Sequence, residues 1–362
     1  MERHPYIESI RRETAAFTDR KIKAGQFGKV FMGIELLTTR KVNDWMKQEY
    51  GKPPARMLFG SFWFEHELCI MFADTNLGKS ILAVQMGANL TIGNTVEPFY
   101  NTSTEPLPVL YVDFELSAKQ FESRYHHQQW GSHLFSDIFY RAEFNPEADD
   151  PVMYASYEKY VEESVSRAIQ QTKAKVLIID NITYMRRGTE KASEAQPLMK
   201  MLKALKIKYK LSVLVLAHTP KRDNRKPLTA NDLQGSKMLI NFADSAFAIG
   251  QSHQDPCLRY LKQIKQRNQQ VQYGEDNVVL IRAEHDYTFL EYKFAGYAAE
   301  YEHLHHQNAN RQADIQQIRQ LHRQGLSLRK IAIELGLHFS AVHRAVKKIK
   351  AEAKDDTAEP GV

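Results

Sequence analysis

Short apolar runs alternate with amphipathic stretches from about residue 58 to residue 294. Strands that alternate with amphipathic helices in this way form a parallel sheet with helices on both faces, and its ligand crevice lies at the carboxyl ends of the strands. The sequence therefore predicts an α/β fold with a doubly wound, mostly parallel sheet. The expected strands are residues 68–73, 108–114, 175–181, 211–217, 244–250, 257–264 and 277–283.

The stretch at residues 71–80 joins the first expected strand to an amphipathic helix and meets the pattern GxxxxGK[ST] at three of its four fixed positions. Backbone N–H groups around Gly78 can wrap a polyphosphate, Lys79 can reach its outer phosphates, and the Ser80 hydroxyl can ligate Mg²⁺. Ala73 stands where the first Gly is expected, and a plain helix start is the alternative. The residues predicted to bind a nucleotide are Ala73, Asp74, Thr75, Asn76, Leu77, Gly78, Lys79 and Ser80.

Three other expected strands end in residues suited to phosphate chemistry. Glu115 could deprotonate a water that attacks a γ-phosphate, although a strand-end acid can also face the solvent. Asp180 ends a run of four apolar residues, where burial does not require an acid, and it could organise Mg²⁺ together with Ser80. Because Asn181 rather than a second acid follows, Glu115 is the favoured base. His218 could sense the γ-phosphate, or it could be a capping or core histidine.

Composition excludes several classes of protein. With 362 residues and 43% hydrophobic content, the chain can bury a large core, and its net charge of +6 is compatible with a polyanionic partner. Cys69 and Cys257 offer neither a disulfide framework nor zinc spacing, as expected in a reducing cytoplasm. The N-terminus has no apolar signal region, and no apolar run is long enough to span a membrane. We therefore expect a cytoplasmic protein that has no membrane segment.

The domain organisation follows from changes in composition and periodicity. We expect a helical N-terminal extension at residues 1–56, with the clearest helix at 39–50, and the α/β domain at residues 57–298. A stretch rich in His, Gln and Asn predicts a linker at residues 299–311. A small helical module should follow at residues 312–350, and an acidic tail at residues 351–362.

The C-terminal module shows the periodicity of three short helices. Gly325 ends the first, Ser327 caps the second, and Gly336 provides a turn before the third. This order resembles the DNA-binding helix-turn-helix of resolvase and repressor families, and the alternative is a three-helix bundle that docks protein. The residues expected to contact duplex DNA are Ser340, His343, Arg344 and Lys347.

The phosphate loop, Glu115, Asp180 and His218 follow one another in an order that resembles the ATPase core of the RecA superfamily. Their spacing is similar to that of replicative helicases of the DnaB and plasmid RepA kind, over about residues 57–294. The resemblance implies a RecA-like sheet, ATP and Mg²⁺ as ligands, and a catalytic Glu at the end of the second strand.

Residues 261–268 resemble the segment that carries a Lys and an Arg into the active site of the adjacent subunit in DnaB-like helicases. By position these are Lys265 and Arg267. An Arg aimed at a transferring phosphoryl group can be worth about 10³ to 10⁵ in rate. The alternative is a basic edge strand that its charges keep soluble.

Two basic loops follow strand ends at residues 185–191 and 220–227. In a RecA-like ring such loops point into the central channel, where basic side chains would neutralise the phosphates of a single strand without reading its sequence. A solvated surface loop is the alternative. The expected contacts are Arg186, Arg187, Lys221, Arg222, Arg225 and Lys226.

Together these features imply an ATP-driven DNA motor. The resemblance suggests a hexameric helicase that acts in replication of a plasmid or other mobile element, with a single strand in the channel and duplex DNA at the helix-turn-helix. The alternative is a DNA-bound ATPase switch or regulator that unwinds nothing. The pair Lys265 and Arg267 discriminates between them, because a switch protein could do without it.

Overall fold

The computed structural model describes residues 37–102, 105–145, 147–148, 157–185, 192–220, 222–233, 237–304 and 316–335, and the single residues 337, 339, 342, 343, 345, 346 and 349. The chain divides into two compact units, Met1–Pro54 and Ala55–Val362. In the first unit, α3 (Val42–Glu49) has no buried residue. This helix is shorter than the run predicted at residues 39–50.

In the described part of the second unit, nine strands form one sheet. Their bounds are β3 (Leu68–Ala73), β4 (Val109–Asp113), β7 (Phe139–Ala142), β8 (Val176–Asp180), β9 (Ser212–His218), β10 (Ser245–Gln251), β11 (Leu258–Lys265), β12 (Val278–Asp286) and β13 (Phe289–Ala298). The order across the sheet is β13-β12-β11-β10-β3-β9-β8-β4-β7. The strands from β10 to β7 are parallel, whereas β11, β12 and β13 are antiparallel to their neighbours. The predicted mostly parallel α/β sheet is thus confirmed, and β7 and β13 are strands that the sequence did not predict.

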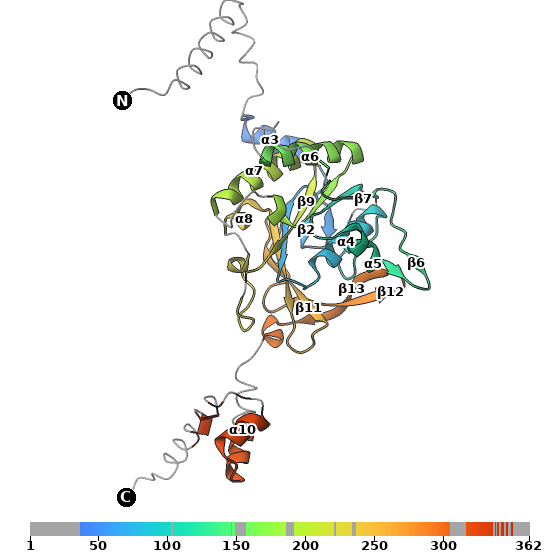
Figure 1. Cartoon of the computed structure of the whole chain (residues 1–362). Coiled ribbons are helices and arrows are strands. Elements are labelled where there is room, and N and C mark those ends of the chain that lie inside the picture. The colour runs from blue at the N-terminus through green and yellow to red at the C-terminus, as the bar shows by residue number, and fades with distance from the viewer. Residues whose placement is uncertain are drawn as a thin grey trace, which may run out of the picture. The chain divides into compact units, whose positions relative to one another are not determined.

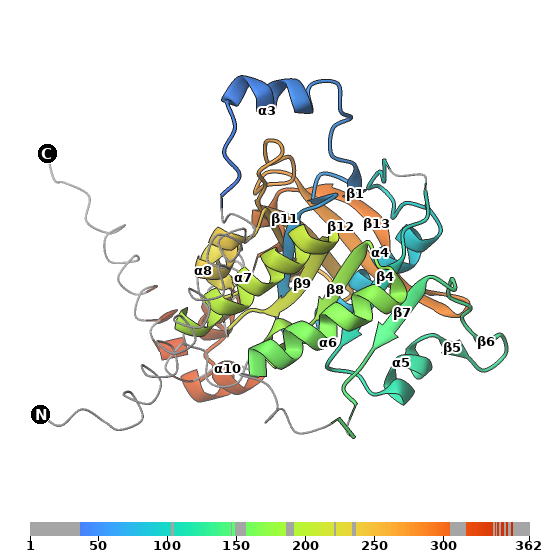
Figure 2. The ribbon, with the colours of Figure 1, turned by 90° about the horizontal axis from the view of Figure 1, so that it is seen from above.

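Helices cover both faces of the sheet (Figures 1 and 2). On one face, a buried apolar cluster includes side chains of α6 (Tyr157–Thr172), α7 (Ala192–Tyr209) and α8 (Lys237–Phe242). The cluster on the other face includes α4 (Lys79–Thr91) and the short strands β1 (Met57–Phe59) and β2 (Trp63–Phe64). The sheet is therefore a central layer buried on both sides.

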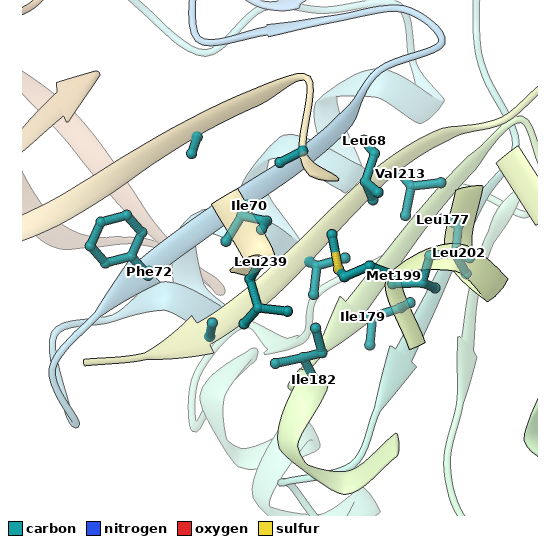
Figure 3. Close-up of a cluster of buried hydrophobic side chains, with 14 of the residues drawn as sticks. Leu68, Ile70, Phe72, Leu177, Ile179, Ile182, Met199, Leu202, Val213 and Leu239 are labelled. Carbon is teal, nitrogen blue, oxygen red and sulfur yellow. The ribbon is translucent and has the colours of Figure 1, made fainter. Parts of the chain in front are cut away.

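The parallel strands supply side chains to both clusters in alternation. Leu68 and Ile70 of β3 pack with Leu177 of β8 on the α6 and α7 face (Figure 3), while Cys69 and Met71 belong to the opposite cluster. Successive side chains of a strand point to opposite faces, so a strand buried on both must be apolar throughout. This explains why these strands appear in the sequence as uninterrupted apolar runs.

A buried ion pair joins β11 to the end of the α/β domain. Lys262 Nζ donates to Glu300 Oε2 at 2.5 Å and to the carbonyl of Leu228 at 2.9 Å. Glu300 Oε1 accepts from Leu228 N at 2.7 Å. Glu300 begins the 3-10 helix η4 (Glu300–His303), in which His303 is also buried. Residues 300–304 therefore belong to the packed domain, and the predicted linker at residues 299–311 starts later than expected; residues 305–311 lie outside the described residues.

Replacing Lys262 with Met should lower the free energy of unfolding by about 3–5 kcal/mol, because Glu300 would be left as a buried charge without its partner. The check is the urea-unfolding midpoint of the full chain. The matched control is Lys119→Met, since Lys119 forms its ion pair with Glu122 while its side chain is 85% exposed. Equal midpoints for the two variants would contradict this account of the ion pair.

The described C-terminal residues form a small helical module. Residues 316–323 are helical, and Ser327 Oγ caps α10 (Leu328–Glu334) by accepting from the backbone of Lys330. A buried cluster joins Ile318, Ile331, Ala332, Val342 and Val346. Of the predicted duplex contacts, His343 is described, while Ser340, Arg344 and Lys347 lie outside the described residues. The helix-turn-helix therefore stays a prediction.

Among the helices that the structure describes, none combines the length and apolar character needed to cross a bilayer.

Candidate active site

The phosphate loop follows β3, the strand that lies between β9 and β10. Ala73 is the buried last residue of β3 and pairs with His218 and Ile249. It has the extended backbone of a strand, so this position needs no glycine. The turn itself depends on left-handed residues, Asn76 with φ +63° and Gly78 with φ +77°. The departure from the motif at Ala73 is thus accommodated in the strand.

The Lys79 side chain folds back over the phosphate loop toward the end of β3. Its buried Nζ donates to the carbonyls of Ala73 and Asp74, each at 3.1 Å, and lies 3.2 Å from His218 Nδ1. Burial lowers the pKa of Lys79, and the negative charges of Asp180, Glu115 and Asp74 partly offset that effect. These contacts hold the ammonium group over the mouth of the phosphate loop.

His218 connects Lys79 to Glu115. The Nε2 atom lies 3.0 Å from Glu115 Oε1, and Glu115 also accepts from the amide of Asn181. Because an ammonium group can only donate, Nδ1 is the acceptor toward Lys79, while Nε2 lies within hydrogen-bond distance of both Glu115 and the Asn181 amide, the latter at 2.9 Å. The three strand ends β4, β8 and β9 therefore meet in one hydrogen-bonded chain.

Glu115 is held as a carboxylate. The hydrogen bond from His218 is the main cause of its lowered pKa, opposed by burial and reinforced by Asn181 and Lys79. Its side chain is 28% exposed, so water can reach it. A partly exposed carboxylate beside the phosphate loop can orient a water and accept its proton.

Asp180 is fully buried at the end of β8. Tyr111 donates to its Oδ2 at 2.6 Å, whereas Oδ1 is buried and has no hydrogen-bond partner among the described residues. Burial raises the pKa of Asp180 to about 6, and the nearby hydroxyls of Ser80 and Tyr111 oppose that rise. A buried oxygen without a partner beside a serine hydroxyl fits Mg²⁺, which prefers oxygen ligands. Among the described residues, no group of three or more His, Cys, Asp or Glu side chains is placed to hold a metal ion.

The turn that carries Glu115 is fixed by a second acid. Asp113 Oδ1 accepts from the backbone N–H groups of Glu115 at 3.0 Å and Leu116 at 2.9 Å. Arg141 of β7 donates from Nε to Asp113 Oδ2 at 3.0 Å and from Nη2 to the carbonyl of Leu116 at 2.5 Å. Arg141 was not singled out from the sequence, because β7 carries no strong strand pattern. Its position beside Glu115 arises from the pairing of β7 with β4.

Lys265 and Arg267 lie on the side of the sheet where the parallel strands begin, whereas the phosphate loop lies where they end. Lys265 pairs with Ala246 near the start of β10, whereas Ala73 pairs with Ile249 near its end. Lys265 Nζ donates to the carbonyl of Ile240 at 2.6 Å, and Arg267 pairs with Asp244 at 3.1 Å while remaining 50% exposed. Neither residue reaches the phosphate loop of its own chain.

The basic loop after β9 is partly engaged with the protein itself. Arg225 makes a bidentate contact with Asp223, at 2.7 and 2.8 Å. The Arg222 side chain is only 9% exposed and lies 3.5 Å from Asp232. The Arg222 side chain therefore lies mostly against the domain, and its contact with DNA stays a prediction. Lys226 is exposed, and Arg186, Arg187 and Lys221 lie outside the described residues.

A glycine-lysine-serine loop between a buried strand and a helix, with Asp180 and Glu115 at neighbouring strand ends, defines the class of P-loop ATPases. The chain belongs to the AAA domain family, whose family model matches residues 37–224. The matched part includes the phosphate loop, Glu115, Asp180 and His218, and it ends before Lys265. No curated protein matches the chain.

Proposed function

We propose that this P-loop ATPase is a DNA motor of the RecA type, working as a hexameric ring helicase in replication of a plasmid or other mobile element. The observation that carries the proposal is the position of Lys265 and Arg267. They lie at the edge of the sheet opposite to the phosphate loop, roughly 10 Å along β10 from the level of Ala73. Cations on one edge and a nucleotide site on the other suit a head-to-tail ring, in which each subunit completes its neighbour's site.

The reaction at the site is hydrolysis of the γ-phosphate. ATP would draw the Lys79 ammonium from His218 to its phosphates, while Glu115 orients and deprotonates the attacking water. Mg²⁺ held by Ser80 and Asp180 would neutralise charge on the phosphates. Arg267 of the next subunit would stabilise the charge that develops in the transition state.

His218 couples this chemistry to the loop that follows it. In the structure His218 touches both Lys79 and Glu115, so a γ-phosphate that takes Lys79 changes the contacts of His218. The basic loop at residues 220–227 begins two residues after His218. A change at His218 on hydrolysis would therefore move this loop. We propose that the loop holds single-stranded DNA through Lys221, Arg225 and Lys226, and that the loop after β8 adds Arg186 and Arg187.

The C-terminal module would provide the duplex contact. Its described residues bury a small apolar cluster around Ile331, which suits a compact helical domain. We propose that the third helix presents Ser340, His343, Arg344 and Lys347 to a major groove. Through this contact the motor would be brought to duplex DNA.

A mixing experiment tests the trans contact. Lys79→Ala removes the phosphate-binding lysine but keeps Arg267. Arg267→Ala keeps the phosphate loop and should hydrolyse ATP about 10³ to 10⁵ times more slowly. In rings assembled at random from equal amounts of the two variants, roughly a quarter of the sites pair an intact loop with an intact Arg267. The mixture should therefore recover roughly that fraction of wild-type ATP turnover, although each variant alone is inactive.

Arg282→Ala is the matched control, since Arg282 is also a partly exposed arginine paired with an aspartate, Asp255, at 2.6 Å. It should keep wild-type turnover. A mixture no more active than the sum of its two components would contradict the trans role. That result would favour the alternative of a DNA-bound ATPase switch without unwinding activity.

A further inference from the structure

We infer that Tyr292 is a positioning residue that holds the phosphate loop in the shape that binds ATP. The inference rests on the proposed ATP site and adds a residue from β13, beyond the part of the chain that the family model matches. The Tyr292 hydroxyl donates to the carbonyl of Leu77 at 2.9 Å, and the side chain is only 4% exposed. A strand at the far end of the domain sequence thus contacts the loop directly.

The backbone of Tyr292 is hydrogen-bonded to α4, the helix that follows the phosphate loop. Gln85 of α4 donates from Nε2 to the carbonyl of Tyr292 at 2.9 Å, and its Oε1 accepts from Tyr292 N–H at 2.9 Å. Gln85 is buried, so both bonds lie away from water, and α4 runs beside β13 (Figures 1 and 2). Tyr292 is therefore attached to α4 through its backbone and to the loop through its hydroxyl.

The contact leaves no room for a side chain at Gly78. A Cβ placed on Gly78 would lie 1.9 Å from the Tyr292 hydroxyl, well inside any allowed separation. Gly78 also has φ +77°, a conformation that other residues seldom adopt. The sequence requirement for glycine at this point of the loop therefore has two causes, and one of them is Tyr292.

The hydrogen bond has a consequence for the nucleotide. In a trans peptide the carbonyl oxygen and the next N–H point to opposite sides. With the Leu77 carbonyl held by Tyr292, the N–H of Gly78 in the same peptide is directed to the opposite side, where it could donate to a phosphate oxygen. Burial raises the pKa of Tyr292 to about 12, so the hydroxyl stays protonated near neutral pH.

The test is Tyr292→Phe in the full chain, which keeps the packed ring and removes only the hydroxyl. We expect the dissociation constant of a fluorescent ATP analogue and the KM for ATP to rise roughly tenfold, with kcat at saturating ATP unchanged. The matched control is Tyr297→Phe on the same strand, where the side chain is 50% exposed, and it should bind as wild type. Binding is measured below the lowest melting temperature of the set.

The outcomes separate this inference from the proposed function. If wild type and Lys79→Ala have equal dissociation constants for the analogue, ATP does not bind at the phosphate loop, and the proposed role of Tyr292 is wrong as well. Should Lys79→Ala lose binding while Tyr292→Phe binds as wild type, the ATP site stands and Tyr292 is only a packing residue. A lowered melting temperature with unchanged affinity would also overturn the inference.

Discussion

Glu115→Gln is expected to bind ATP as wild type does and to hydrolyse it about 10² to 10⁴ times more slowly. The substitution keeps the shape of the side chain and one oxygen for Asn181 and His218, so the site should remain assembled. What is lost is the carboxylate, whose pKa the His218 hydrogen bond lowers and which can take the proton of the attacking water. The effect should therefore fall on kcat and leave affinity for ATP unaltered.

The measurement pairs a binding titration with single-turnover hydrolysis, so that chemistry is separated from product release. Glu122→Gln is the control, because Glu122 of α5 (Ala118–Arg124) lies near in sequence and pairs with the exposed Lys119. It should hydrolyse ATP at the wild-type rate. Normal turnover by Glu115→Gln would mean that another group is the base.

Lys79→Ala is expected to weaken ATP binding about 10- to 100-fold and to reduce turnover further, by about 10² to 10³ at saturation. Lys79 is buried and its Nζ already lies against the carbonyls of the loop, so its charge acts at close range on any phosphate bound there. Because we propose that the lysine contacts the outer phosphates, ADP should lose less affinity than ATP.

This prediction is checked by isothermal titration with ATP and ADP, beside steady-state hydrolysis. Lys119→Ala removes a lysine of high exposure and is the matched control. If Lys79→Ala bound ATP and ADP as tightly as wild type, the phosphate loop would not be the nucleotide site. Equal losses for ATP and ADP would instead mean that Lys79 acts on the inner phosphates.

The parts of the fold that the sequence predicted share one physical origin. Strands such as β3 and β8 are buried on both faces, so they appear in the sequence as continuous apolar runs. The two strands of the nine-stranded sheet that it missed, β7 and β13, lie at the edges of that sheet. β7 has no fully buried residue, and β13 buries only Tyr292 completely, so neither shows an apolar run.

The residues of the candidate site divide in the same way. Glu115, Asp180 and His218 could be predicted because the carboxyl ends of parallel strands meet at one edge of a sheet. Arg141 and Tyr292 could not, because their partners are set by tertiary packing rather than by any local pattern. Tyr292 lies 215 residues from Leu77, the residue whose carbonyl it holds.

Arg222 shows what a basic loop pattern leaves open. A basic loop residue after a strand end suggests a solvent-facing side chain, yet Arg222 packs into the domain beside Asp232. The sequence shows which residues are charged but not which acid each of them will form an ion pair with. Lys226, four residues on, remains exposed and keeps its proposed place on the DNA-facing surface.

We propose that ATP hydrolysis at this site is completed by a neighbouring subunit and coupled to single-stranded DNA. This proposal is tested most directly by steady-state ATP hydrolysis of the purified full chain with Mg²⁺, with and without single-stranded DNA at one stated salt concentration, beside Arg267→Ala. We expect strong stimulation of hydrolysis by single strands in wild type and none in the variant. Slow turnover that is indifferent to DNA and equal in the two proteins would contradict it.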